Sequence, residues 1–529
     1  MARDSGVCGD LELDNHFVGA SRTKSLNSLV TDSAAGATAY ATGLRTWNHV
    51  VAEVPVEERN MEHMHTGEGM GNMNHSSKGK QSHLKPVGTI LEGAQLAGMR
   101  TGIVTTTRVT HATPASFSSH VADREDENEI AREQVISLEL NVLLGGGLSR
   151  FVNSSVVGST RDDTLDLLMI AGNRGYEIAF DANELQERVE TLTTTGTTSS
   201  PSTPNPHPFV HTKNGPRLLG LFSDSHLPYE IDVHGGLKAF NNSQTPHNDT
   251  SHETPSLAQM LDAALKTLDA KWSDTDTIND NGFILVVEAG RIDHASHAND
   301  ASAVLGEVCA YDRAFERAIE YALERDDTLV VATSDHDTGG LSVGCCDEYG
   351  MHVDRVVEVT QSAEFVASQI VSRIFSEIGS DAEALNSSSA VASVTAIVVD
   401  SLTNANRDPN DETSKISSED ISTLVTSAIN ASLTGESATH SYEGYELQNK
   451  LGEVMNAPNL IGWTSHAHTG VDVPVFAFGA QSHSFHGSHA NFQIGRAMID
   501  LMDVDPEHGY MVFRDRLGLV NPSFDEPDR

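Results

Sequence analysis

Two apolar segments separated by a long helical pattern constrain the fold of this chain more than any other feature. The segments GFILVVEAG (282–290) and DTLVVATSD (327–335) are short and rich in β-branched residues. Such runs are typical of strands buried on both faces of a sheet. Residues 299–326 between them repeat apolar side chains at helical spacing. A strand, a helix and a second strand form a βαβ unit, which predicts a parallel sheet with its chemistry at the carboxyl ends of the strands.

Two further segments, RTGIVTTTRVTHATP (100–114) and DVPVFAFGA (472–480), extend this pattern. We therefore expect an α/β fold in which a large, central, mainly parallel β-sheet is flanked by helices on both faces. A single domain is expected over residues 11–515, followed by a tail at 516–529. Three segments are expected to be surface insertions because of their biased composition: the His-, Met- and Gly-rich residues 60–82, the Thr-, Ser- and Pro-rich residues 191–214, and the Ser- and Thr-rich residues 384–440.

The charge of the chain restricts its partners. The 529 residues carry a formal net charge of −41, with a sequence pI near 4.8. This acidity argues against binding to nucleic acid or to an anionic membrane surface. It also repels anionic substrates at long range, so a phosphate site in this chain would need metal ions or arginines around it.

A serine among very small side chains is the first candidate for chemistry. In SLVTDSAAGATAYATG (28–43), Ser33 follows Asp32 and precedes an alanine-rich run. The pattern predicts the start of a helix capped by Asp32 or Ser33, with the free N–H groups of the first turn directed at an anion. By itself, an ordinary capped and tightly packed helix explains the motif equally well.

Candidate metal ligands follow the predicted strands. In EAGRIDHASHAND (288–300), Asp293 and His297 are four residues apart and would share one face of a helical turn, and Glu288 ends the strand before them. Asp335 and His336 follow the second strand directly. Each pair is weak alone, but the carboxyl ends of parallel strands meet at one edge of a sheet.

Two more clusters would meet at the same edge. SHAHTG offers His466 and His468, one of which could complete a tetrahedral site, and RVTHATP offers His111 and Thr113 on alternate positions. Together, the clusters favour a site with two or three metal ions beside Ser33.

These motifs and their order resemble those of the alkaline phosphatases. The matching segments are VTDSAAGATAYATG, TTTRVTHATPASFSSH, VEAGRIDHASHAND, ATSDHDTGG and AHTGVDVPVFAFG, and the similarity extends from about residue 11 to about residue 515. The resemblance implies a phosphomonoester hydrolase that acts through a phosphoserine at Ser33. It further implies that Asp32 helps to hold the phosphate-binding arginine, which corresponds to Arg124.

The resemblance also implies two zinc ions and one magnesium ion. The first zinc would be held by Asp293, His297 and His468. The second would be held by Asp335, His336 and Ser33. Magnesium would be held by Thr113 and Glu288. His111 would contact the metal ligands without binding a metal itself, and His294 would lie near the substrate. The two histidines occupy places where some bacterial members carry Asp and Lys, so the site is similar to the animal type.

Partners and compartment are implied by the same resemblance. We expect small phosphomonoester substrates, no nucleic-acid partner and a homodimer. The full-length form is expected to follow the secretory pathway, to an extracellular or membrane-associated place. No signal or transmembrane segment is present in the sequence. Glycosylation sequons occur at six asparagines: Asn74, Asn153, Asn241, Asn248, Asn386 and Asn430. The pairing of the four cysteines (Cys8, Cys309, Cys345 and Cys346) stays open, although a bond between the adjacent Cys345 and Cys346 would be strained.

Other functional classes remain as alternatives. A Ser-His-Asp hydrolase would need a Gly-x-Ser-x-Gly elbow, which Ser33 lacks, and would survive a chelator. Phosphodiesterases and sulfatases share the metal scaffold, but the Asp-Ser-Ala-Ala motif and Arg124 favour a monoesterase. A third alternative is a metal-binding homologue with little or no turnover.

The start of the chain supports that third alternative. The family's first motif is a strand ending in an aspartate that bridges the second zinc and the magnesium, and residues 1–25 contain no such strand. We expect a truncated form of a longer enzyme, with exposed edges on the neighbouring strands, weak metal binding and slow turnover. The later segment TGEGMGNMN (66–74) is expected to be an insertion loop, near His63, His65 and His75, which could bind metal.

Overall fold

Five parallel strands form the larger sheet of the computed structural model, which describes residues 5–55, 84–194, 215–242, 253–270, 281–345, 349–385, 387–407, 416–434 and 446–509. The strand order is β6 (Glu177–Ala179), β7 (Leu218–Leu221), β5 (Val142–Gly146), β4 (Arg100–Arg108) and β8 (Phe283–Glu288). The parallel direction brings the carboxyl ends of these strands to one edge, as expected.

A four-stranded sheet holds the second strand of the βαβ unit. Its order is β15 (Gly487–Ala490), β1 (Phe17–Arg22), β14 (Val473–Gly479) and β9 (Leu329–Thr333). Strand β14 runs antiparallel to both β1 and β9, and β1 runs parallel to β15. The expected strands at 282–290, 327–335, 100–114 and 472–480 are therefore present as β8, β9, β4 and β14.

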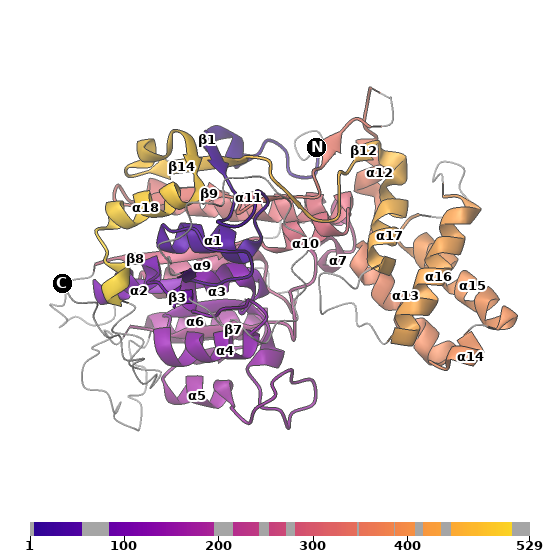
Figure 1. The fold of residues 1–529 in the computed structure, drawn as a ribbon, viewed down its shortest axis with the longest axis horizontal. Helices are drawn as coiled ribbons and strands as arrows, with labels where there is room; N and C mark the ends of the chain where they lie inside the picture. Colours follow the sequence, from indigo (N-terminus) through magenta and orange to yellow (C-terminus); the bar gives the residue numbers. More distant parts are fainter. Residues whose placement is uncertain are drawn as a thin grey trace.

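Helices cover both faces of these sheets, which confirms the predicted α/β class (Figure 1). Side chains at alternate positions of a strand enter opposite cores: Ile103 of β4 lies in one and Val104 in the other. The first face packs against α1 (Ser33–Thr42), α2 (Ile90–Leu96), α3 (Ala112–Ser118), α4 (Glu127–Glu133), α5 (Leu167–Asn173) and α18 (Asn491–Met502). The opposite face packs against α6 (Ala182–Thr194), α9 (Leu257–Leu268) and α11 (Ala301–Leu323).

Helix α11 joins the two sheets, and it confirms the predicted helix between β8 and β9. Its Ala314 packs in the core of the five-stranded sheet, and its Phe315 and Ile319 pack on the four-stranded sheet. The short helix α10 (Arg291–His297) lies between β8 and α11 and carries the Asp293 motif.

Strands β8 and β9 are less buried than their sequences predict. All nine residues of β4 except the first are buried, whereas all six residues of β8 are only half-buried. Four of the five residues of β9 are half-buried as well. Within the described part of the chain, β8 pairs only with β4 and β9 only with β14, so each leaves one edge unpaired. No described strand covers that edge of β8 or of β9, which leaves both strands partly accessible to solvent.

A helical bundle projects from the sheet-containing part (Figure 1). It is built mainly from α13 (Ala363–Glu377), α15 (Ser388–Asn404), α16 (Ser418–Thr434) and α17 (Glu446–Asn456), with α14 (Ala382–Leu385) at one end. The expected insertion at 384–440 thus includes two long helices, whose apolar residues such as Val394, Val398 and Leu424 are buried. Its status as an insertion stays a prediction.

The remaining elements are short. They are β2 (Glu53–Pro55), β3 (Leu84–Pro86), α7 (Glu230–Val233), α8 (Leu237–Asn242), β10 (Asp337–Thr338), β11 (Ser342–Val343), α12 (Val353–Glu358), β12 (Ile461–Gly462) and β13 (His468–Thr469). A disulfide joins Cys8 to Cys309 of α11. Among the described helices, none combines the length and the apolar character that a membrane span requires.

Several expectations fall outside the described residues. These are the insertion at 60–82 with His63, His65 and His75, nearly all of the insertion at 191–214, the tail at 516–529, the sequons at Asn74, Asn248 and Asn386, and Cys346.

Candidate active site

Ser33 opens helix α1, and its neighbours are arranged as the sequence predicts. The Asp32 carboxylate caps the helix, because its Oδ1 accepts a hydrogen bond of 3.0 Å from the N–H of Ala35. Every residue of α1 is buried. A Cβ at Gly36 would lie 3.0 Å from Cβ of Asp335, so a side chain there would crowd the segment that follows β9.

Asp32 also holds an arginine beside Ser33. The Arg124 guanidinium donates a hydrogen bond of 3.1 Å to Oδ2 of Asp32, and the backbone N–H of His49 donates to the same oxygen at 3.0 Å. Arg124 is buried, and its backbone N–H bonds to the carbonyl of His49. This carboxylate therefore fixes the arginine at the start of the helix, where an anion would sit.

The Asp293 cluster, which consists of Asp293, His297 and His468, joins α10 to β13. The Nε2 atoms of the two histidines are 3.0 Å apart, and Oδ1 of Asp293 lies 3.4 Å and 3.5 Å from them. The predicted sharing of one helix face by Asp293 and His297 is thus present. Of the two candidates in SHAHTG, His468 reaches the cluster, and His466 instead contacts the carboxylate of Glu453 at 2.9 Å.

Backbone carbonyls orient both histidines of the Asp293 cluster. Nδ1 of His297 contacts the carbonyl of His466 at 2.5 Å, and Nδ1 of His468 contacts the carbonyl of Thr31 at 2.9 Å. A carbonyl only accepts, so each Nδ1 must carry a hydrogen, and in the neutral ring Nε2 then has the lone pair. Lone pairs that converge on one carboxylate, with N–H groups directed away to carbonyls, form the usual arrangement of a histidine metal site.

His336 connects this cluster to the serine. Its Nε2 lies 2.9 Å from Oγ of Ser33 and 3.2 Å from Oδ2 of Asp335, and its ring stacks 3.5 Å from the ring of His468. Burial alone would lower the pKa of His336, but the carboxylates of Asp335, Asp293 and Asp32 together outweigh burial and raise the pKa to about 9. Asp335, His336 and Ser33 therefore form a second group of candidate ligands, in contact with the first.

Glu288 and Thr113 form a group with oxygen donors only. Oε2 of Glu288 accepts hydrogen bonds from the hydroxyls of Thr105 at 2.5 Å and Thr107 at 3.2 Å, and the Thr113 hydroxyl also bonds to this carboxylate. Burial, with a further contribution from Asp335, raises the pKa of Glu288 to about 7. Carboxylate and hydroxyl oxygens are the donors that a hard cation such as Mg²⁺ prefers.

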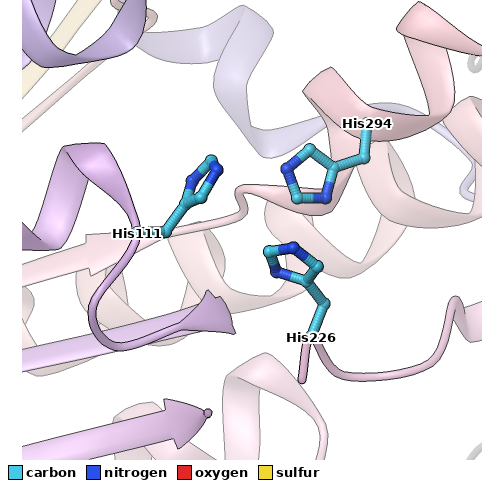
Figure 2. Close-up of side chains that lie close together, drawn as sticks. All are labelled: His111, His226 and His294. Carbon is cyan, nitrogen blue, oxygen red and sulfur yellow. The ribbon is translucent and has the colours of Figure 1, made fainter. Parts of the chain in front are cut away.

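The His226 cluster, which consists of His111, His226 and His294, is a second group of histidines (Figure 2). Each ring offers one nitrogen, and the three nitrogens lie within 4.8 Å of one another. Burial, together with nearby arginines, lowers the pKa of all three rings well below the usual value. His111 and His294 were predicted to lie at the site, but His226 was not predicted. Its position after β7, at the carboxyl end of a parallel strand, is the signal that could have found it.

All the predicted site residues thus lie in one connected region at the carboxyl ends of β4, β8 and β9. Ser33, His336 and the Asp293 cluster contact one another directly. Arg124 contacts both Asp32 and Nε2 of His111. His294 lies in the His226 cluster.

Comparisons with known proteins show which family the chain belongs to. The family model of alkaline phosphatase matches residues 6–198 and 205–504. The chain is 33% identical to an alkaline phosphatase of Schizosaccharomyces pombe, with 98% of this chain and 81% of the relative covered. It is 30% identical to the repressible alkaline phosphatase of Saccharomyces cerevisiae, with 94% and 76% covered.

Solved structures give the same result. The crystal structure of Thermus thermophilus alkaline phosphatase aligns with a TM-score of 0.65 at 25% identity, and the alignment covers 97% of this chain and 91% of that one. The cold-active enzyme of a Shewanella species aligns with a TM-score of 0.62 at 25% identity, covering 93% and 92%. The match spans both sheets and every group of site residues, and the chain belongs to the alkaline phosphatase family of phosphomonoester hydrolases.

Proposed function

We propose that this chain hydrolyses phosphomonoesters through a phosphoserine at Ser33. The observation that carries the proposal is the placement of the Ser33 hydroxyl at a buried helix start, 2.9 Å from His336 and next to an arginine that Asp32 holds. The Ser33 oxygen attacks phosphorus, the ester P–O bond breaks, and the serine proton ends on the leaving alcohol. Water then attacks the phosphoserine, which restores the hydroxyl and releases inorganic phosphate.

Arg124 and the start of α1 bind the transferred group. The planar guanidinium of Arg124 can bond to two phosphoryl oxygens at once, and the N–H groups of the first helical turn add further donors. Because Asp32 fixes the guanidinium before substrate binds, little ordering of this side chain is left for the reaction itself.

We further propose two zinc ions and one magnesium ion as the metal content. The converging lone pairs of the Asp293 cluster suit zinc, as does the mixed set of Asp335, His336 and Ser33. Thr113 and Glu288 offer only oxygen, which suits magnesium. Bound at these residues, the ions would act as Lewis acids that favour the deprotonated Ser33 hydroxyl and offset charge on the phosphoryl oxygens. With His111 and His294 beside these ligands, the site is of the animal type, which has two histidines where some bacterial members carry Asp and Lys.

The alternative of a homologue with little turnover is not favoured, because the chain matches the phosphatase family over nearly its whole length. The expected weakness of metal binding can be tested separately. Elemental analysis of the purified chain should give fewer than three metal ions per chain without added metal, and full occupancy would contradict that expectation.

The test of the nucleophile is the trapping of the phosphoenzyme. Ser33→Ala should abolish the covalent phosphate that accumulates when the enzyme and a phosphomonoester are quenched at acid pH. The matched control is Ser28→Ala, at a half-buried serine five residues earlier and outside the helix, which should still be labelled. A phosphoenzyme in the Ser33→Ala protein, identified by mass spectrometry, would disprove the assignment.

We propose that the protein is a homodimer that passes through the secretory pathway. The disulfide between Cys8 and Cys309 supports an oxidising route, and the sequon Asn430 is exposed on α16. Sedimentation at micromolar concentration should give twice the monomer mass, and removal of N-linked glycans should lower the mass of the secreted protein.

A further inference from the structure

The hydrogen-bond partners of the His226 cluster are all donors. Nε2 of His111 lies 3.2 Å from the Arg124 guanidinium, and Nδ1 of His294 lies 2.9 Å from the guanidinium of Arg291. Arginine N–H groups only donate, so each of these ring nitrogens must accept. A neutral imidazole has one lone pair, and its other nitrogen then carries a hydrogen. For these rings, no acceptor of that hydrogen is found among the described residues.

His226 is surrounded by more donors than it can accept from. Its Nδ1 lies 3.1 Å from the backbone N–H of Arg108, and its Nε2 lies 2.6 Å from the guanidinium of the same residue. One lone pair can serve only one of these donors. The other contact places two N–H groups against each other, which costs free energy unless the two groups move apart and share an acceptor.

The arginines around the cluster are held in place from their other sides. Asp32 binds Arg124, and Glu364 binds the guanidinium of Arg291 at 2.7 Å. Glu127 is shared by Arg108 at 2.8 Å and Arg150 at 3.3 Å, so two positive charges meet one carboxylate. The cluster is therefore rich in fixed N–H donors and positive charge. Among the described residues no acceptor is hydrogen-bonded to its rings, although the Asp293 carboxylate lies near His111 and His294.

This arrangement is the opposite of a metal site. A cation at the His226 cluster would need the lone pairs that the arginines already occupy, and it would lie beside their positive charges. An anionic oxygen would accept hydrogen bonds from the free ring N–H groups and would separate the opposed donors of His226 and Arg108.

We propose that His111, His226 and His294 bind a second phosphate-type oxyanion beside the phosphoryl group that Ser33 attacks. The proposal rests on the proposed function and adds to its substrate class a preference for phosphate esters and anhydrides with a further phosphoryl group. Arg124 links the two positions, because its guanidinium contacts both Asp32 and His111. The same chemistry would also bind free inorganic phosphate, the product.

The first experiment measures binding. Titration calorimetry with inorganic phosphate should detect two sites per chain. His226→Leu removes the ring nitrogens and should abolish one of them, whereas His226→Gln keeps a side-chain N–H and should retain it. The control is His486→Leu, at an exposed histidine away from the cluster. A single site in the wild-type chain, or loss of neither site in His226→Leu, would overturn the proposal.

The second experiment separates the two sources of phosphate. If the ligand belongs to the substrate, His226→Leu should lower kcat/KM for inorganic pyrophosphate about tenfold, as expected for a lost charge-assisted hydrogen bond, and should change kcat/KM for phenyl phosphate little. If the ligand is the product, only inhibition by inorganic phosphate should weaken. Either result supports an oxyanion site.

Three outcomes distinguish failure of this proposal from failure of the proposed function. If the wild-type chain and His226→Leu have the same kcat/KM for pyrophosphate and the same inhibition by inorganic phosphate, and both still hydrolyse phenyl phosphate, the oxyanion site is refuted and the proposed function is not. Loss of one metal equivalent in His226→Leu, with unchanged anion binding, would instead make the cluster a metal site. Absence of phenyl phosphate hydrolysis by the wild-type, metal-loaded chain would refute the proposed function itself.

Discussion

The Asp293 cluster and the His226 cluster use the same side chain for opposite purposes. In the first, backbone carbonyls contact Nδ1 of His297 and His468, so the lone pairs of these rings face a carboxylate. In the second, arginine N–H groups use up the lone pairs of the rings. The comparison teaches that proximity of three histidines does not identify a metal site. The partner of each second ring nitrogen decides whether the ring offers a lone pair or a hydrogen.

Removal of the carboxylate from the Asp293 cluster should have the largest effect. Asp293→Ala deletes the charge on which the lone pairs of His297 and His468 converge, so we expect loss of at least one zinc equivalent and a fall in kcat/KM of at least about 100-fold. Elemental analysis and phenyl phosphate hydrolysis measure the two effects. Asp500→Ala, on the exposed side of α18, is the control. An unchanged zinc content in Asp293→Ala would show that the Asp293 cluster does not bind zinc, and the two clusters would then not differ in metal binding.

Substitution of Arg124, which contacts both Asp32 and His111, should have the second-largest effect. Arg124→Lys keeps the charge but cannot bond to Asp32 and to two phosphoryl oxygens in one plane, so kcat/KM should fall on the order of 30-fold, corresponding to about 2 kcal/mol. Because Arg124 also contacts His111, binding of inorganic phosphate should weaken as well. Arg132→Lys on α4, where the arginine pairs with Glu129, should change neither quantity. Equal kinetics for the two variants would contradict the role of Arg124.

A third arrangement, in which carboxylates flank a histidine, sharpens the comparison. His120 lies between Glu92 and Glu133, near Glu53, and its Nε2 contacts the carbonyl of Val87 at 3.1 Å. Burial alone would lower the pKa of His120, but the carboxylates raise it to about 10. Since the folded pKa lies above the unfolded value of 6.5, the stabilisation is complete below pH 6.5 and is lost as pH rises through about 10.

His120→Gln should therefore destabilise the fold by about 2 kcal/mol at pH 6 and by much less at pH 10.5. Urea unfolding followed by circular dichroism at both pH values measures the difference. A loss of stability that is equal at the two pH values would show that packing, rather than charge, accounts for the effect.

The smallest effect on activity is expected at His466, which lies two residues before His468 but is not part of the Asp293 cluster. Its ring pairs with the half-exposed Glu453 and contacts the backbone carbonyl of His297 at 2.7 Å. Exposed pairs of this kind contribute about 0–1 kcal/mol, so His466→Gln should keep its zinc and nearly all of its activity. Loss of zinc in this variant would mean that the ring of His466, and not only its carbonyl, supports the site.

Much of the site could be predicted because its residues lie at positions with local rules. Asp32 precedes an alanine-rich run and caps it, and Asp293 and His297 have the spacing of one helical turn. Asp335 follows an apolar strand directly. Each of these relations extends over a few residues, so the sequence contains it in full.

The rest depends on contacts between distant segments. His226 stands alone in SDSHLPYE, and nothing near it indicates that Arg108, over a hundred residues earlier, contacts both of its ring nitrogens. Likewise, the Ser- and Thr-rich composition of residues 384–440 obscures the apolar stripe of α15, on which Val394 and Val398 are buried. Hydrogen-bond partners and bundle packing are set by the tertiary structure.

The unpaired edge of β8 has a consequence for hydrogen exchange. In a parallel strand, the N–H groups of alternate residues point toward opposite edges. Those of β8 that face β4 are hydrogen-bonded, whereas those at the other edge find no strand among the described residues. Amide protection along FILVVE should therefore alternate between slow and fast from one residue to the next, although the segment is more apolar than β4, which is paired on both sides.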